Sequence, residues 1–247
     1  MEFKADALVL RAADWGEYDK IVTLFTAERG KLSAALKGVK RAGAKLKFAA
    51  QPFCFAEFVF AEKAGRHTVI SAALHDGFYP LREDIACYYA AVVLCEACDR
   101  LLFEGIESPA LFLAAVRTLE ALSSCAEGTG GEARLEDGRS GSSYVLLRFL
   151  LTALKEAGYP VSAAACPHCG EQLSGRMRFD MESGAFGCEA CGGGVPASES
   201  TYLAVRAALG QGGEVTADGV KRALRLLSAY FAFQASELPS LAEYLRL

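Results

Sequence analysis

Four cysteines have the residue type and the spacing of a metal site. Cys166 and Cys169, then Cys188 and Cys191, form a C-x2-C, x18, C-x2-C arrangement. Two intervening residues let both sulfurs of a tight turn face one ion, and the glycine after each pair permits that turn. The residues between the pairs suffice for a hairpin that brings the second pair opposite the first. Because four thiolates fill a tetrahedron, the pattern predicts one structural Zn²⁺; a redox or vestigial set is the alternative.

A catalytic zinc site of the deaminase kind is excluded by the order of residues. Such sites carry H-x-E followed by P-C-x-x-C. Here Pro167 lies inside the first cysteine pair, and neither His67 nor His75 is followed two residues later by Glu. His168 is expected to be an exposed turn residue, with a role as substitute ligand as the alternative.

The other cysteines are expected to be small buried apolar residues. Cys95 and Cys98 form a second C-x-x-C, but they lie in an apolar, helix-like segment with no partner pair. Free Cys is usually buried, and the same interpretation covers Cys54, Cys87 and Cys125. An odd count of nine cysteines, and an N-terminus MEFKAD unlike a secretory signal, predict a reduced cytoplasmic protein. The most apolar run, YYAAVVLCEACDRLLF, contains Glu96, Asp99 and Arg100, so no membrane helix is expected there.

A second candidate site is a run of positive charge. The segment 29–48 carries seven Lys or Arg and no Asp or Glu, in a chain with 26 basic and 30 acidic residues. Residues 1–79 hold 12 basic and 9 acidic residues, a net charge of +3, which leaves −7 for the remainder. A focused positive patch on an acidic protein can follow a phosphate backbone without indiscriminate binding. The segment therefore predicts a nucleic-acid contact, with an ordinary solvated surface as the alternative.

Aromatic residues near this run offer stacking faces for unpaired bases. Phe48, Phe53, Phe55 and Phe58 are the nearest, although alternation at 53, 55 and 60 favours a buried strand face. Trp15, the sole tryptophan, lies in the polar segment ADWGEYDK as either a rim residue or an anchor.

The motifs of common enzymes are missing from the sequence. The segment GVKRAGAKL has two glycines at phosphate-loop spacing, but Ala44 stands where the lysine must be. Lys45 comes one place late, and Leu46 after it lacks the required hydroxyl. The sequence contains no nucleophile elbow and no convincing carboxylate cluster. The protein is therefore expected not to be an enzyme.

The sequence patterns around these residues predict the strands and helices of an α+β fold. Five short runs rich in Val, Ile, Phe and Thr occupy residues 1–79 and predict a five-stranded OB-type barrel, with an SH3-like barrel as the alternative. Helical periodicity from Pro80 predicts a helical domain in two parts, 80–160 and 198–247, with the cysteine knuckle inserted at 161–197. The Gly- and Ser-rich segment 125–143 is expected to be a mobile surface loop.

The order of these parts resembles the bacterial recombination mediator RecO family. The segments ALVLRAADWGEYDKIVTLFTAERGKLSAALKGVKR and AQPF resemble the family's N-terminal barrel, and LLRFLLTALKEAGYPVSAAACPHCG resembles its helix leading into a four-cysteine knuckle. The resemblance covers nearly the whole chain. It implies a protein that binds single- and double-stranded DNA and anneals complementary strands. It also implies joint action with RecR to load recombinase onto strands coated with single-strand binding protein.

The resemblance also implies which residues serve these roles. DNA-binding positions carried over from the family are Lys37, Lys40 and Arg41, extended by Lys31, Lys45 and Lys47. Arg148 beside Phe149 is the implied contact for the acidic, apolar C-terminal tail of single-strand binding protein. The segment 42–44 and the C-terminal ELPSLAEYLRL depart from the family pattern.

One function of another class competes with this interpretation. A four-cysteine ribbon and a small barrel also suit an RNA-binding or scaffold protein of transcription or translation. Dependence of binding on the 2′-hydroxyl would favour RNA, whereas nucleotide-independent annealing of DNA strands would favour the mediator.

Overall fold

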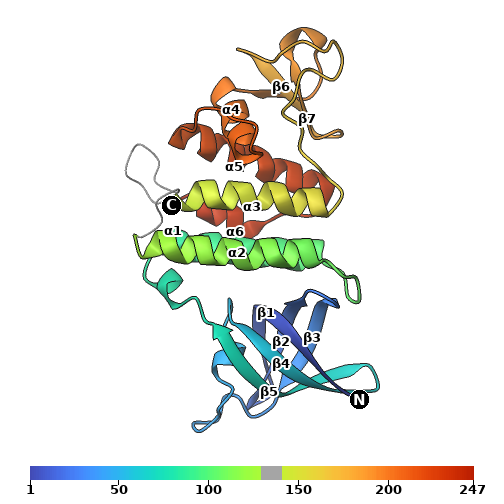
Figure 1. Ribbon diagram of the computed structural model, residues 1–247, viewed down its shortest axis with the longest axis vertical. Coiled ribbons are helices and arrows are strands. Elements are labelled where there is room, and N and C mark those ends of the chain that lie inside the picture. Colours follow the sequence, from blue (N-terminus) through green and yellow to red (C-terminus); the bar gives the residue numbers. More distant parts are fainter. Residues whose placement is uncertain (129–140) are drawn as a thin grey trace.

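Five strands form a closed barrel at one end of the molecule (Figure 1). The strands are β1 (Glu2–Trp15), β2 (Asp19–Thr26), β3 (Gly30–Leu36), β4 (Phe55–Lys63) and β5 (Arg66–Asp76). They pair in the order β1-β2-β3-β5-β4, and β4 closes the barrel onto β1. All pairs are antiparallel except a short parallel contact of β3 with β5. The predicted OB-type barrel is therefore confirmed.

Strand β1 shows how the sequence buries both faces of one strand. Residues 7–10 are all buried. Because side chains alternate along a strand, Ala7 and Val9 enter the barrel core while Leu8 and Leu10 join the core of the helical body. The barrel is therefore packed against the helices by apolar side chains from its own wall.

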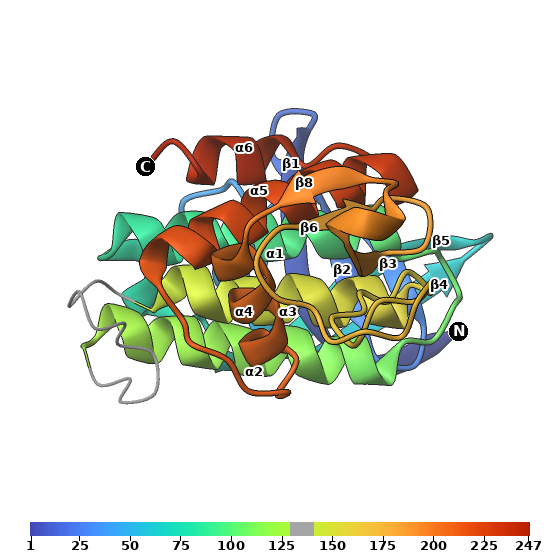
Figure 2. The same ribbon diagram turned by 90° about the horizontal axis from the view of Figure 1, so that it is seen from above.

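In the described part of the chain, six α-helices form the body above the barrel (Figure 1). They are α1 (Ile85–Leu101), α2 (Pro109–Ala126), α3 (Ser142–Glu156), α4 (Glu199–Ala208), α5 (Ala217–Gln234) and α6 (Pro239–Tyr244). Asp84 caps α1 by accepting a hydrogen bond from the backbone N–H of Cys87 at 2.7 Å. Seen from above, α2 and α3 run side by side (Figure 2).

The structure, a computed structural model, describes residues 1–128 and 141–247. The predicted loop 125–143 falls mostly outside these ranges. At its described margins, α2 continues through Ala126 and α3 begins at Ser142.

Helix α2 is long and apolar enough to cross a membrane by length and composition, with a mean hydropathy of 1.2. A single such helix is weak evidence, because core helices of water-soluble proteins pass the same test. One side of α2 packs in the core of the helical body, where Leu119 and Leu122 are fully buried.

A three-stranded sheet carries the cysteines at the far end of the molecule. It consists of β6 (Met177–Asp180), β7 (Ala185–Cys188) and β8 (Val195–Ala197) in the order β7-β6-β8. The rings of Phe179 and Phe186 lie 5.0 Å apart. Tyr230 of α5 packs edge-on against Phe179 at 5.3 Å, and Tyr202 of α4 packs against Phe186 at 5.4 Å. The knuckle is thus attached to the helical body through the packing of four aromatic rings.

The barrel and the helical body are joined along the start of β3. The backbone N–H of Lys31 donates to Phe103 O at 3.3 Å, and the N–H of Gly105 donates to Arg29 O at 3.1 Å. Gly30, with φ +59°, lies so close to the α1–α2 loop that an added Cβ would be 2.1 Å from Ile106 O. Only a glycine fits this junction.

Candidate metal centre and nucleic-acid interface

The four knuckle cysteines meet at one point. The sulfurs of Cys166, Cys169, Cys188 and Cys191 all lie within 4.8 Å of one another, and those of Cys169 and Cys188 are 3.7 Å apart. Four sulfurs around Zn²⁺ at bond lengths of about 2.3 Å would be separated by roughly 3.8 Å. The predicted hairpin supplies this geometry, because β6 and β7 return the second pair opposite the first. The residues are close enough to bind one metal ion and fit Zn²⁺ by distance and donor type.

Local electrostatics at the knuckle favour a cation. Backbone N–H groups of Cys188, Cys169 and His168 lower the pKa of the Cys166 thiol to about 6. Hydrogen bonds with the sulfurs of Cys188 and Cys169 raise the pKa of Cys191 to about 12, and the nearby charge of Cys166 adds repulsion. A divalent cation among the four sulfurs would remove that repulsion.

Both turns of the knuckle have the backbone conformation that their glycines permit. Gly170 has φ +77° and Gly192 has φ +69°. His168 lies exposed between Cys166 and Cys169, and it is absent from the four-sulfur cluster. Four sulfur ligands would leave no coordination position for water, so the arrangement suits a structural role.

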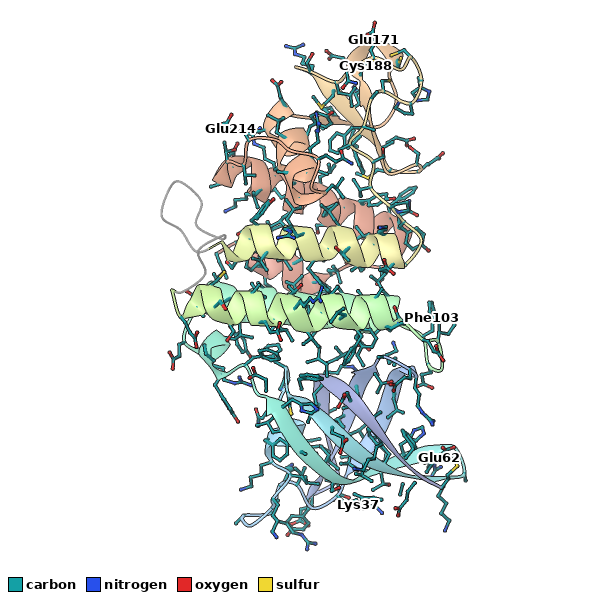
Figure 3. The ribbon with its side chains drawn as sticks, viewed as in Figure 1. Lys37, Glu62, Phe103, Glu171, Cys188 and Glu214 are labelled. Atoms are coloured by element: carbon teal, nitrogen blue, oxygen red, sulfur yellow. The ribbon has the colours of Figure 1, made fainter. Side chains whose placement is uncertain are left out.

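The basic segment 29–48 comprises β3 and most of the β3–β4 loop. Figure 3 places Lys37 at the end of the barrel that points away from the helices, and Cys188 at the opposite end of the molecule. Lys37, Arg41, Lys45 and Lys47 are exposed in this loop. The candidate nucleic-acid surface and the candidate metal centre therefore lie at opposite ends.

The β3–β4 loop is fastened to the turn between β1 and β2. The Asp19 carboxylate accepts a hydrogen bond from the N–H of Gly38 at 2.7 Å, and Tyr18 O accepts one from the N–H of Lys40 at 3.0 Å. The Arg41 guanidinium lies over the Tyr18 ring, 5.0 Å from its centroid. At its other end, the loop enters the short turn η1 (Phe48–Ala50), which buries Ala49 and Ala50 in the barrel core. The loop is held in place at both ends.

Lys40 is exposed but paired. Its ammonium donates to the Asp14 carboxylate at 2.9 Å, and Lys20 lies 3.6 Å from the same carboxylate. The hydrogen bond from Lys40 lowers the pKa of Asp14. DNA phosphates would have to compete with Asp14 for Lys40.

Lys31 points toward the helical body instead of the loop. Its ammonium donates to Asp99 O at 2.6 Å and lies 3.3 Å from the Asp99 carboxylate. Arg11 of β1 pairs with the same carboxylate at 3.1 Å. The structure thus separates Lys31 from the other basic residues of the segment and uses it at the junction.

The aromatic residues singled out near the basic run face inward. Phe53 and Phe58 are buried, while Phe48 and Phe55 are half-buried and packed on the two cores. The exposed rings at this end are instead Trp15 (65% exposed) and Tyr18 (43% exposed). Sequence reasoning missed the pairing of Tyr18 with the loop, although two aromatics in the polar ADWGEYDK turn were a usable signal.

The two residues implied for tail binding differ in exposure. Arg148 is exposed on α3, but Phe149 is only 2% exposed and belongs to the helical core. Phe149 therefore offers no surface to a peptide, because consecutive helical residues point to different sides.

The other cysteines are buried, with the exception of the half-buried Cys125. Burial raises the pKa of Cys54 and of Cys95 to about 12 and that of Cys98 well above its ordinary value. The prediction that Cys95 and Cys98 are small buried residues is confirmed by their burial in α1.

Two family models match consecutive parts of the chain. A model described as "Recombination protein O N terminal" matches residues 1–78, and one described as "Recombination protein O C terminal" matches residues 82–242.

Curated proteins named "DNA repair protein RecO" are similar over most of the chain. The protein from Nocardioides sp. is 32% identical over 243 residues, 94% of each chain. That from Myxococcus xanthus is 32% identical over 201 residues, 81% of this chain and 76% of the relative. That from Desulfitobacterium hafniense is 28% identical over 190 residues, 76% of this chain, and the alignment spans 64% of the relative's length.

Proposed function

This chain belongs to the RecO family, and from that premise we propose that it is a DNA-binding mediator of recombinational repair. It binds single- and double-stranded DNA through the free end of the barrel and anneals complementary strands. With RecR it helps to load recombinase onto strands coated with single-strand binding protein. It acts in the cytoplasm at the nucleoid and carries out no catalytic step of its own.

One observation supports this proposal more than any other. Lys37, Arg41, Lys45 and Lys47 are exposed together on a loop that is fastened to the rest of the barrel. Cations held on a rigid frame neutralise phosphates and release condensed counterions without selecting a base sequence. Two strands that repel each other can meet on such a surface, which is the physical requirement for annealing.

Annealing in the absence of any nucleotide tests the proposal. Two complementary DNA oligonucleotides, one carrying a fluorophore and the other a quencher, are mixed with and without the protein. We expect the protein to accelerate pairing and the double variant Lys37→Ala, Lys45→Ala to accelerate it less. The matched control, Lys155→Ala with Lys221→Ala, removes two exposed cations from α3 and α5 and should anneal like the parent.

The same assay separates the mediator from the RNA-binding alternative. RNA strands of identical sequence are annealed in parallel. A protein that leaves DNA annealing unchanged while binding RNA through its 2′-hydroxyls would refute the proposal and favour the alternative.

We further propose that the knuckle binds one structural Zn²⁺ through Cys166, Cys169, Cys188 and Cys191. The support is the distance among the four sulfurs and the absence of an oxygen or nitrogen donor from that cluster. When bound, the ion would link the two cysteine turns. The chain's own contribution is the aromatic cluster beneath, which orients the hairpin on α4 and α5.

For the acidic tail of single-strand binding protein, we propose Arg148 as a contact for a carboxylate. Its exposure on α3 supports this role, whereas Phe149 is left out because it is buried. A tail peptide should bind Arg148→Ala more weakly than Lys221→Ala in a polarization titration. Equal affinities would remove Arg148 from the proposal.

A further inference from the structure

Two large aromatic side chains are exposed at the same end of the barrel as the basic loop. The basic loop is the part of the β3–β4 loop that carries Lys37, Lys40, Arg41, Lys45 and Lys47. Trp15 ends β1 and Tyr18 precedes β2, on either side of a short turn in which Gly16 has φ +65°. Trp15 is 65% exposed and Tyr18 is 43% exposed, and neither belongs to the apolar core of the barrel or of the helical body. Leaving a tryptophan ring in water forgoes the stabilisation that burial would give. Packing within the described part of the chain therefore gives no reason for a tryptophan at position 15.

The turn and the basic loop form one surface. Trp15 is paired with Asp19 across the hairpin, and the Asp19 carboxylate binds the N–H of Gly38 in the loop. Tyr18 is connected twice, through its carbonyl to Lys40 and through its ring to Arg41. Two hydrogen bonds and the stacking of Arg41 on Tyr18 thus hold the turn that carries both aromatic residues against the loop that carries the cations.

We propose that Trp15 stacks on an unpaired base of a strand whose phosphates contact the basic loop. This inference rests on the proposed DNA binding and specifies its ligand as single-stranded nucleic acid. Stacking needs an open base face, and in a duplex both faces are covered by neighbouring base pairs. Cations alone bind both forms of DNA, so the ring is the feature that favours the single strand. The inward-facing Phe48, Phe53, Phe55 and Phe58 are not available for this role.

Because Trp15 is the sole tryptophan, its fluorescence reports directly on the proposed contact. The protein is titrated with a thymidine oligonucleotide, with the same oligonucleotide lacking bases, and with a duplex closed by hairpins at both ends. Binding of each is measured independently by anisotropy of a label on the DNA. We expect quenching that saturates together with binding for the thymidine strand, and unchanged emission for the abasic strand and the closed duplex at saturation.

Substitution supplies a second readout. Loss of one base stack typically lowers affinity by about 5- to 150-fold. Trp15→Ala should therefore weaken single-strand binding by at least about fivefold, while duplex affinity, salt dependence and melting temperature stay as in the parent. Trp15→Phe should retain most of the affinity. Phe103→Ala, which removes an exposed ring from the α1–α2 loop far from Lys37 (Figure 3), is the matched control and should bind both DNA forms normally.

The outcomes separate this inference from the proposed function. Single-strand binding that leaves the emission unchanged, or equal losses of single-strand and duplex affinity in Trp15→Ala, would overturn the stacking role alone. No binding of either DNA by the parent would overturn both.

Discussion

At the residue scale, Asp14 controls how many cations the basic loop presents. Its carboxylate pairs with Lys40 at 2.9 Å and with Lys20 at 3.6 Å. The hydrogen bond from Lys40 lowers the pKa of Asp14 below its ordinary value of 3.8. A carboxyl whose folded-state pKa is depressed is charged above that value and is protonated only as the pH falls through it. Asp14 is therefore charged, and able to pair with Lys40, at every pH at which DNA binding is usually measured.

Neutralising Asp14 should strengthen DNA binding. In Asp14→Asn, Lys40 no longer has a charged partner and becomes available to a phosphate. Each added contact steepens the log–log salt dependence by about 0.7 on single strands. A salt titration measures this change, and Glu57→Gln, which removes an equal charge from a pair with Lys4, is the control. Equal effects of the two substitutions would mean that net charge, and not the release of Lys40, is responsible.

The two classes of cysteine should differ in reactivity. Burial raises the pKa of Cys54 and Cys95 to about 12 and keeps both sulfurs from solvent. In the knuckle, backbone N–H groups lower the pKa of Cys166 to about 6, and Cys169 and Cys191 are exposed. Thiolates are the reactive form. After removal of metal by a chelator, iodoacetamide should modify the knuckle cysteines of the folded protein first, as read by peptide mass spectrometry. Alkylation of Cys95 at the same rate would contradict the assignment of the buried class.

At the element scale, the knuckle is a hairpin stabilised at two places, by aromatic packing at its base and by the sulfur cluster at its tip. The aromatic cluster of Phe179, Phe186, Tyr202 and Tyr230 holds its base. The four sulfurs hold its tip and are the proposed ligands of the metal. Metal binding stabilises isolated zinc fingers by on the order of 10 kcal/mol, and by less where a core already exists.

Removing half of the ligands should therefore affect metal content and stability together. We expect Cys166→Ser with Cys169→Ser to be purified with less than one zinc per chain and to melt at a lower temperature than the parent. His168→Ala should keep both values, because His168 lies outside the sulfur cluster. The measurements are elemental analysis and thermal unfolding. Full metal content in the double variant would refute the ligand set.

The elements differ in how far the sequence predicts them. The knuckle hairpin is predictable because the ligand spacing is local and each pair is followed by a glycine with positive φ. The helix start at Asp84 is predictable from its capping residues. The choice between OB and SH3 barrels is not, because it depends on the pairing of β3 with β5, about 30 residues apart in the chain. The sequence does not predict strand β8 or helix α6, because both are short and have weak patterns.

At the scale of the whole molecule, the junction orients the barrel on the helical body. Gly30 is its closest approach, with an added Cβ only 2.1 Å from Ile106 O and 2.8 Å from Phe103 O. Asp99 adds the pairs with Arg11 and Lys31. None of these contacts follows from the local sequence, so the sequence does not distinguish Lys31 from the basic residues of the β3–β4 loop. The domain limits 1–79, 80–160, 161–197 and 198–247 stay a prediction.

A matched pair of glycine substitutions tests the junction. Both Gly30 and Gly65 have positive φ, but nothing lies within 4 Å of a Cβ added at Gly65. Gly65→Ala should cost only the backbone strain, about 1–2 kcal/mol. Gly30→Ala should cost roughly 1–3 kcal/mol more, because the added carbon forces the α1–α2 loop away from β3. Urea unfolding measures the free energy of unfolding of each variant. Equal decreases would show that the α1–α2 loop accommodates the added carbon at Gly30 without loss of stability.

The central claim concerns the charge distribution over the whole chain. We propose that the exposed basic residues of the β3–β4 loop bind DNA phosphates, whereas Lys31, at the junction of the barrel and the helical body, does not. Residues 1–79 carry +3 and the remainder −7, so attraction to DNA is expected at the barrel. The sequence predicts this segregation, since charges are counted directly. It does not distinguish Lys31 from Lys45, which only the fold separates.

The most direct measurement is the salt dependence of single-strand binding. We predict that Lys37→Ala with Lys45→Ala makes the log–log slope shallower by about 1.4, because two counterion-releasing contacts are lost. Lys31→Ala should keep the parent slope while lowering stability, and Lys155→Ala with Lys221→Ala should change neither. If the loop variant kept the parent slope, or if Lys31→Ala made it shallower to the same extent, the basic loop would not be the DNA-binding surface.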